Sequence, residues 1–164
     1  MSFDQLGLRV ELLKAVKAKG YTAPTPIQVK AIPVILDGRD IFARAQTGTG
    51  KTDAFALPLV EILSRRKGNG RHPRALVLAP TRELALQVGE SIKAYARRVS
   101  LRCTVVHGGV RINPQIDRLR RGIDVLVATP GRLLDLAGRR QLKLSRIEFL
   151  VFDEADRMLD LGFS

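Results

Sequence analysis

The sequence contains a single cysteine, Cys103, and no tryptophan. One cysteine cannot form a disulfide within the chain, which is typical of proteins that fold in a reducing compartment. No apolar run approaches the ~20 residues needed to span a membrane. The first residues also lack the charged head and apolar stretch of a signal peptide. These absences predict a soluble protein of the cytoplasm.

Acidic residues are scarce relative to basic ones. The chain has 16 Asp and Glu against 28 Lys and Arg, which gives a formal net charge of +12. Such an excess attracts polyanions, most commonly nucleic acid, although a solvated basic surface is the alternative. Clusters of arginine are interpreted as solvated helix ends without assigned contacts; they are Arg97-Arg98, Arg118-Arg120-Arg121 and Arg139-Arg140. His72 and His107 lack metal-ligand spacing, and Cys103 is expected in the core.

The periodicity predicts an α/β fold with a mostly parallel sheet flanked by helices. Five short apolar runs alternate with helical stretches, which is typical of buried parallel strands in βαβ units. These predicted strands cover residues 40–43, 75–79, 104–106, 125–128 and 149–152. Before them, one helix is predicted over residues 8–19 and a second from Thr25-Pro26-Ile27-Gln28, where Thr25 and Gln28 suit a capping box. The length of 164 residues suits one domain with one core.

Each unusual motif directly follows one of these predicted strands. The motifs are residues 46–52, 80–84, Gly108-Gly109, 129–132 and 153–156. Open α/β sheets bind ligands at the carboxyl ends of their strands, so all five motifs are expected to converge on one edge. This convergence indicates a functional site.

The segment Ala45-Gln46-Thr47-Gly48-Thr49-Gly50-Lys51-Thr52 is interpreted as a phosphate-binding loop. Gly48 and Gly50 allow successive backbone N–H groups to point at phosphate oxygens. Lys51 adds positive charge there, and the Thr52 hydroxyl suits Mg²⁺. An ordinary glycine turn is the alternative. The general pattern begins with glycine, where this chain has Ala45.

Two adjacent carboxylates follow the last predicted strand. Hydrolysis of a phosphoanhydride needs an acid that holds the metal and a group that positions water. Asp153 suits the first role, through a metal-bound water, and Glu154 suits the second. The alternative is that both are acidic residues at a helix N-terminus, where the helix dipole favours them.

These motifs together resemble the first RecA-like domain of the DEAD-box RNA helicases, and within them the bacterial RhlE subgroup. The resemblance runs from Phe3 to Phe163. It rests on Gly20-Tyr21-Thr22-Ala23-Pro24-Thr25-Pro26-Ile27-Gln28, residues 45–52, Pro80-Thr81-Arg82-Glu83-Leu84-Ala85, Thr129-Pro130-Gly131-Arg132 and Asp153-Glu154-Ala155-Asp156. Alanine is the first residue of the family's phosphate loop, which accounts for Ala45.

The resemblance implies a RecA-like P-loop fold that binds Mg²⁺ and ATP. A nucleotide-recognising region over residues 1–38 would precede a P-loop core over residues 39–164 that lacks the family's remaining strands. A second RecA-like domain, which supplies arginines to the γ-phosphate, is expected as a partner and is absent from the 164 residues. The isolated chain is therefore expected to bind ATP and RNA weakly without unwinding. Asp156 would couple to a Ser-Ala-Thr segment beyond Ser164.

The resemblance also implies the nucleotide contacts. Gln28 would read the adenine edge with its amide, with capping as its rival role, and Phe3 would stack on the ring. The remaining predicted contacts are Tyr21, Gln46, Thr47, Gly48, Thr49, Gly50, Lys51 and Thr52, with Lys51, Asp153 and Glu154 catalytic. Asp53 departs from the small residue common in the family, and its charge is expected to weaken nucleotide affinity modestly.

RNA contacts are expected where helices begin after strands, since helix N-termini present free N–H groups to phosphates. The resemblance assigns to the RNA backbone Pro80, Thr81, Arg82, Gly108, Gly109, Thr129, Pro130, Gly131 and Arg132. Plain N-capping is the alternative for the two threonines. The function implied is an RNA-stimulated ATPase that opens short duplexes, with little sequence specificity. The rival classes are a DNA translocase, a small P-loop kinase or GTPase, and a non-enzymatic RNA-binding module.

Overall fold

The computed structural model describes residues 1–43, 50–68 and 70–154. Contacts divide the chain into two compact units. The first comprises Met1–Arg66 with Ser91–Ser100, and the second comprises Lys67–Glu90 with the residues from Leu101 onward. Helix α4 (Arg82–Ala96) contributes to both. The prediction of a single domain with boundaries at residues 38 and 39 stays a prediction.

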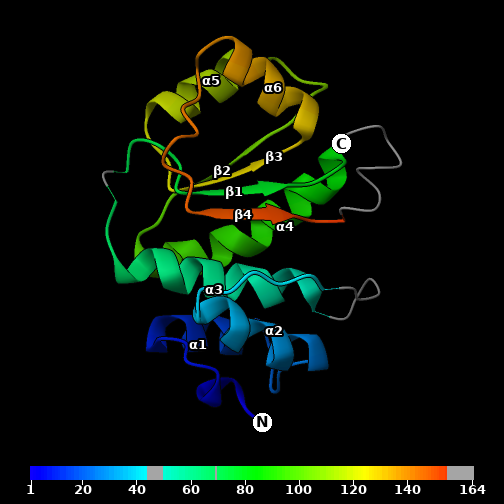
Figure 1. Ribbon diagram of the computed structural model, residues 1–164, viewed down its shortest axis with the longest axis vertical. Helices are drawn as coiled ribbons and strands as arrows, with labels where there is room; N and C mark the ends of the chain where they lie inside the picture. Colours follow the sequence, from blue (N-terminus) through cyan, green and yellow to red (C-terminus); the bar gives the residue numbers. More distant parts are fainter. Residues whose placement is uncertain (44–49, 69, 155–164) are drawn as a thin grey trace. The chain divides into compact units, whose positions relative to one another are not determined.

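The first unit is helical. It contains the 3₁₀ helix η1 (Phe3–Gln5), α1 (Val10–Ala18), α2 (Pro26–Leu36), α3 (Lys51–Arg65), the end of α4, and the 3₁₀ helix η2 (Arg97–Val99). Helix α1 buries Leu12, Ala15 and Val16, whose spacing places them on one face. Helix α3 is buried over most of its length and packs against α2. Figure 1 shows α1, α2 and α3 in blue to cyan-green.

Helix α2 begins as the sequence predicts. The Thr25 hydroxyl accepts a hydrogen bond from Gln28 N at 3.4 Å, and Gln28 Oε1 accepts one from Thr25 N at 3.0 Å. Pro26 occupies the first helical position, where its missing N–H group costs nothing. The predicted capping box is therefore confirmed.

The second unit contains a four-stranded parallel sheet in the order β2-β3-β1-β4. The strands are β1 (Ala75–Leu78), β2 (Cys103–Val106), β3 (Val125–Ala128) and β4 (Phe149–Phe152). Leu76 lies opposite Leu126 on β3 and opposite Leu150 on β4. The predicted parallel α/β fold is confirmed, with four of the five predicted strands. Cys103 begins β2 and is half-buried.

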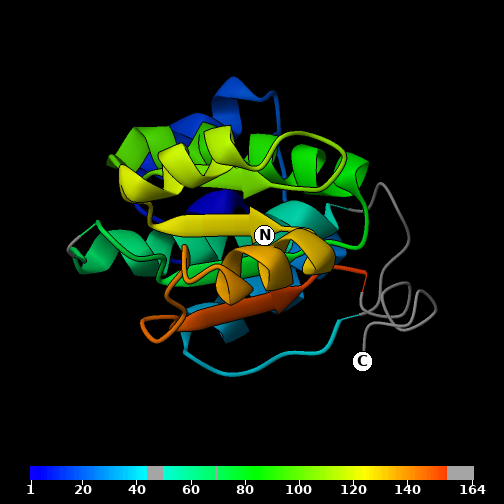
Figure 2. The same cartoon turned by 90° about the horizontal axis from the view of Figure 1, so that it is seen from above.

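Helices α5 (Asn113–Arg120) and α6 (Pro130–Gly138) lie together over one face of the sheet (Figures 1 and 2). Side chains from both helices and from the strands form the core of this unit. Its members include Leu76, Val106, Ile116, Leu126 and Leu136. At Gly89 of α4 a Cβ would overlap the Val105 side chain, so this helix approaches β2 closely. Glycine is needed there for packing.

The predicted strand over residues 40–43 is wrong. These residues are not in a strand, and Phe42 is 75% exposed. A buried parallel strand needs a neighbour that pairs with its backbone and layers that cover its side chains. In the described part of the chain, no strand pairs with this segment.

Among the described residues, no helix is long and apolar enough to cross a membrane.

Candidate functional site

The start of α3 carries the described end of the predicted phosphate loop. Gly50 caps the helix with φ +81° and ψ 19°, a left-handed conformation that favours glycine. A Cβ at Gly50 would also overlap the Gln28 amide and lie 2.9 Å from Thr25 Oγ1. Lys51 and Thr52 begin the first turn of α3, and the positive end of the helix dipole there favours an anion. Ala45, Gln46, Thr47, Gly48 and Thr49 lie outside the described residues.

Gln28 connects the start of α2 to the start of α3 through hydrogen bonds. Its Oε1 atom completes the capping box, and its Nε2 atom donates to the Gly50 carbonyl at 3.1 Å. The residue is only 3% exposed. A primary amide has two N–H donors and two acceptor lone pairs, so one donor and one lone pair remain for a base. The capping role is confirmed, and adenine recognition stays a prediction.

The other two residues predicted near the base differ in exposure. Phe3 is buried in η1, whereas Tyr21 is 45% exposed. Both belong to the first unit, together with Gln28 and Gly50. Ring stacking by Phe3 requires an accessible face, so its contact with adenine stays a prediction.

Asp53 anchors a buried charged cluster in the first turn of α3. Its Oδ1 atom lies 3.8 Å from Lys19 Nζ, at the end of α1. The Lys19 ammonium also lies 4.0 Å from the centre of the Tyr95 ring, which is fully buried. Lys19 and Tyr95 were not predicted from sequence. The only signal was a carboxylate at position 53, which needs a counter-charge once it is buried.

Burial shifts the ionisation of this cluster. It raises the pKa of the Asp53 carboxyl, and the Lys19 charge opposes the rise. It lowers the pKa of Lys19, which the Asp53 charge opposes. The pKa of the Tyr95 hydroxyl is raised, first by burial and then by the Asp53 charge. Asp53 was expected to weaken nucleotide affinity through its negative charge. Because Lys19 offsets that charge, the expected repulsion of the nucleotide phosphates is smaller.

Replacing Asp53 with asparagine is expected to change how stability depends on pH. A folded pKa above the usual 3.8 means that the folded state binds more protons, so this carboxyl's stabilising contribution is lost as pH rises through its raised pKa. The free energy of unfolding of the wild type, minus that of Asp53→Asn, should therefore fall between about pH 4 and about pH 6.

Urea unfolding at both pH values measures this difference. Asp37→Asn is the matched control, because Asp37 forms an exposed ion pair with Arg39 at 3.2 Å. A difference that rises over this range would contradict the assigned direction of the shift.

Asp153 and Glu154 lie at the carboxyl end of β4. The backbone N–H of Asp153 donates to the Leu78 carbonyl at 2.9 Å, which holds the turn against the end of β1. Asp153 is buried and Glu154 is half-buried. Glu154 has φ +52°, a left-handed conformation that costs a non-glycine residue about 1–2 kcal/mol. Strain of this kind concentrates at functional sites, which supports the prediction for Glu154. Asp156 lies outside the described residues.

Four predicted motifs share one edge of the sheet, called here the carboxyl rim. It consists of residues 80–84, 108–109, 129–132 and 153–154, which follow β1, β2, β3 and β4. The strands are parallel and end in register, because Leu78 pairs with Ala128 and Phe152, and Val106 also pairs with Ala128. The predicted convergence is thus confirmed for these four motifs.

The glycines of the carboxyl rim leave room for a ligand. A Cβ at Gly108 or Gly131 would meet nothing within 4 Å, and neither residue has a positive φ. The fold itself therefore tolerates a side chain at both positions. Gly109 has φ +77°, and a Cβ there would lie 3.7 Å from the Arg82 guanidinium. Arg82 and Gly109 are accordingly neighbours, although they follow different strands.

Arg132 holds the rim together. Its guanidinium donates to Gln115 Oε1 at 2.8 Å and to the Val110 carbonyl at 3.0 Å. Gln115 is buried in α5 and donates in turn to the His107 carbonyl at 3.0 Å. This network fixes the loop that contains Gly108 and Gly109. Gln115 was not predicted from sequence, since an isolated glutamine on a short helix carries no pattern.

The two predicted threonines differ. Thr81 Oγ1 accepts from Leu84 N at 3.3 Å, so Thr81 caps the start of α4. Thr129 precedes Pro130 at the start of α6, and among the described residues its side chain makes no capping hydrogen bond. Capping thus accounts for Thr81 and does not account for Thr129. RNA contacts by both threonines, Pro80 and Pro130 stay predictions.

Comparisons with known proteins point in one direction. A family model described as DEAD/DEAH box helicase matches residues 25–164. The chain is 47% identical to DEAD-box ATP-dependent RNA helicase 52A of Oryza sativa subsp. japonica, over 98% of this chain and 29% of that protein. It is 46% identical to ATP-dependent RNA helicase CshA of Limosilactobacillus reuteri, over 99% of this chain and 32% of that protein. The chain therefore spans less than a third of these relatives.

Proposed function

The chain belongs to the DEAD/DEAH box helicase family, and from this premise we propose that it is the ATP-binding domain of an RNA-stimulated ATPase that opens short RNA duplexes locally. The carboxyl rim carries the proposal, because one edge brings helix starts and open glycines next to two carboxylates. The names of the relatives, which include ATP-dependent RNA helicases from a plant and a bacterium, support it. Placement in the RhlE subgroup and in the cytoplasm belongs to the same proposal.

Residues at the start of α3 and residues after β4 have side chains suited to bind Mg²⁺ and the phosphates of ATP. The Thr52 hydroxyl and the Asp153 carboxylate offer the oxygen ligands that this ion prefers, alongside water and phosphate oxygens. When bound, the ion neutralises charge that develops on the phosphates. Lys51 would add a second positive charge there, and the first turn of α3 would contribute the positive end of its helix dipole. Glu154 would orient the attacking water and accept its proton.

RNA would bind along the carboxyl rim through its phosphates. Arg82 offers an exposed guanidinium, and Gly108 and Gly131 allow the backbone to approach closely. Arg132 would act by holding the loop through Gln115 and Val110. A DNA translocase of related fold is the closest rival function. Stimulation of ATP hydrolysis by RNA but not by DNA, measured on the full-length protein, would separate the two.

Gln28→Ala is expected to lower ATP affinity about tenfold and to remove the preference for ATP over GTP, because the lost amide is the group that distinguishes the bases. Titration of the purified chain with fluorescent analogues of both nucleotides measures this ratio. Thr25→Ala is the control: it disrupts the same capping box, at a cost of about 1 kcal/mol, but keeps the amide. Equal losses for ATP and GTP in Gln28→Ala would leave the residue with a purely structural role.

Gly131→Ala is expected to weaken RNA binding about tenfold while raising stability by up to ~1 kcal/mol, since alanine favours the helix but crowds a phosphate. Anisotropy titrations with two unrelated RNA sequences should show the same loss, because backbone contacts carry no sequence information. Gly138→Ala, at the other end of α6, is the matched control, since a Cβ there also meets nothing within 4 Å. Unchanged RNA affinity in Gly131→Ala would remove this helix start from the proposed interface.

A further inference from the structure

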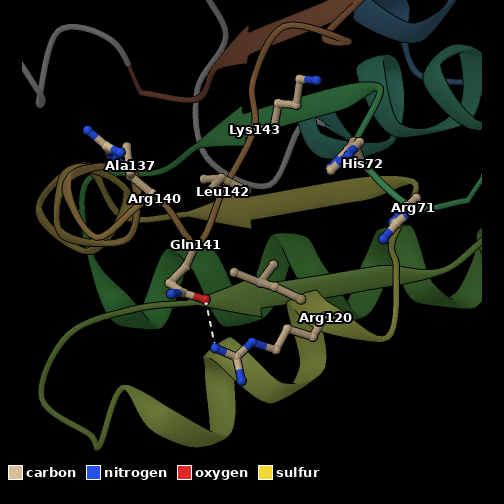
Figure 3. Close-up of a pocket in the computed structure, with 9 residues that line it drawn as sticks. Arg71, His72, Arg120, Ala137, Arg140, Gln141, Leu142 and Lys143 are labelled. Carbon is tan, nitrogen blue, oxygen red and sulfur yellow. Dashed lines mark hydrogen bonds between the residues drawn. The ribbon is translucent and has the colours of Figure 1, made fainter.

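A basic groove lies at the amino ends of the strands, opposite the carboxyl rim of the same sheet. It has a volume of about 500 Å³ and is lined by Arg71, His72, Arg120, Arg140 and Lys143, together with apolar residues that include Leu119. Figure 3 shows these side chains arriving from separate segments. None of its nine lining residues, all in the described part of the chain, is acidic.

The topology explains why these cations meet. Arg71 and His72 precede β1, and Arg120 ends α5 before β3 begins. Arg140 and Lys143 lie between α6 and β4. Because β1, β3 and β4 are parallel neighbours, the segments that enter them gather at one edge. The parallel sheet therefore concentrates positive charge at this edge, and the four-residue strands separate it from the carboxyl rim by about 13 Å.

Arg140 stands at a position that glycine ordinarily occupies. Helix α6 ends with two backbone hydrogen bonds, from Arg140 N to the Ala137 carbonyl and from Gln141 N to the Leu136 carbonyl, both at 3.0 Å. This closing motif requires a left-handed residue, and Arg140 has φ +57°. Glycine would adopt this conformation without strain, so the turn itself does not call for an arginine side chain.

The neighbouring Arg139 provides a contrast. Its guanidinium pairs with Asp135 at 2.9 Å, one turn earlier on α6. Arg120 donates to the neutral Gln141 Oε1 at 3.3 Å, the dashed line in Figure 3, so this contact leaves its charge in place. Arginine forks match the geometry of phosphate oxygens, and the residues that line the groove include no Phe, Tyr or Trp on which bases could stack.

We propose that this basic groove binds the phosphate backbone of a single-stranded RNA that extends past the carboxyl rim. The proposal rests on the proposed function, since the same RNA would occupy both edges of the sheet. Contacts would be independent of base identity. An RNA that covers the carboxyl rim alone is too short to reach the groove, so the groove would add affinity only for longer strands.

The test compares oligouridines of about 6 and about 20 nucleotides binding to the purified chain over a series of salt concentrations. Arg140→Gln with Lys143→Gln removes two charges and keeps polar side chains. For the long RNA, the slope of log K against log salt should become shallower by about 1.4, or about 0.7 for each lost phosphate contact. Binding of the short RNA should not change.

Lys14→Gln with Arg98→Gln is the control, since it removes two exposed charges outside the groove. If the control changes the long-RNA slope equally, the effect comes from the overall positive charge of the protein and not from the groove. That result would overturn the proposal. So would a long-RNA slope that the groove substitutions leave unchanged, or groove-dependent binding of an acidic peptide but not of RNA. If the short RNA binds but the groove substitutions do not change the long-RNA slope, the groove inference fails and the proposed function stands. If neither RNA binds, the proposed function fails with it.

Discussion

Replacing Glu154 with glutamine in the full-length protein is expected to lower ATP turnover by about 10²–10⁴-fold, with little change in nucleotide affinity. Glutamine has nearly the same size and still orients water through hydrogen bonds. It cannot accept the proton that the attacking water loses. Because the left-handed backbone at Glu154 is strained for either residue, the substitution should leave stability almost unchanged.

Steady-state hydrolysis and equilibrium nucleotide titration together make this measurement. Glu90→Gln is the control, because Glu90 is an exposed carboxylate on α4, away from the carboxyl rim. Lys51→Ala should behave differently and weaken nucleotide binding itself, since it removes positive charge from the first turn of α3. Normal turnover in Glu154→Gln would refute the role assigned to this carboxylate.

Structural features formed by residues that are close together in the sequence were predictable. The capping box between Thr25 and Gln28 forms within one helical turn, so the local pattern contains all of its atoms. Strands β1 to β4 were predictable because their buried apolar runs alternate with helices. The order β2-β3-β1-β4 differs from the order along the chain and was not predicted, but the parallel direction of the strands places the predicted motifs on one edge.

Features that depend on distant partners were not predictable. Residues 40–43 have the apolar character of a strand, but a strand exists only where a neighbour supplies hydrogen bonds. Asp53 was noticed as unusual, yet its partners Lys19 and Tyr95 come from the ends of other helices. Arg132 was assigned to RNA, whereas two of its hydrogen bonds hold Gln115 and Val110. Sequence patterns identify which side chains matter more readily than they identify what each one contacts.

The second large effect concerns residues 1–164 assayed alone. Their RNA-stimulated ATP hydrolysis is expected to be about 10³–10⁵-fold slower than that of a polypeptide that adds a second RecA-like domain. By the family resemblance, that domain would supply the arginines that face the γ-phosphate. In the described part of the chain, the predicted catalytic groups are one lysine and two carboxylates, Lys51, Asp153 and Glu154. None of these supplies a guanidinium to the transferring phosphate.

Three measurements on the same preparations test this expectation. Hydrolysis with saturating RNA gives the rate difference, separation of a short RNA duplex gives the unwinding activity, and nucleotide titration verifies that residues 1–164 still bind ATP. The two-domain polypeptide with Glu154→Gln is the control, since it restores the arginines and removes the base. Its hydrolysis should fall toward that of residues 1–164 while its nucleotide binding stays intact. Robust unwinding by residues 1–164 alone would show that closure of two domains over ATP and RNA is not what drives duplex opening.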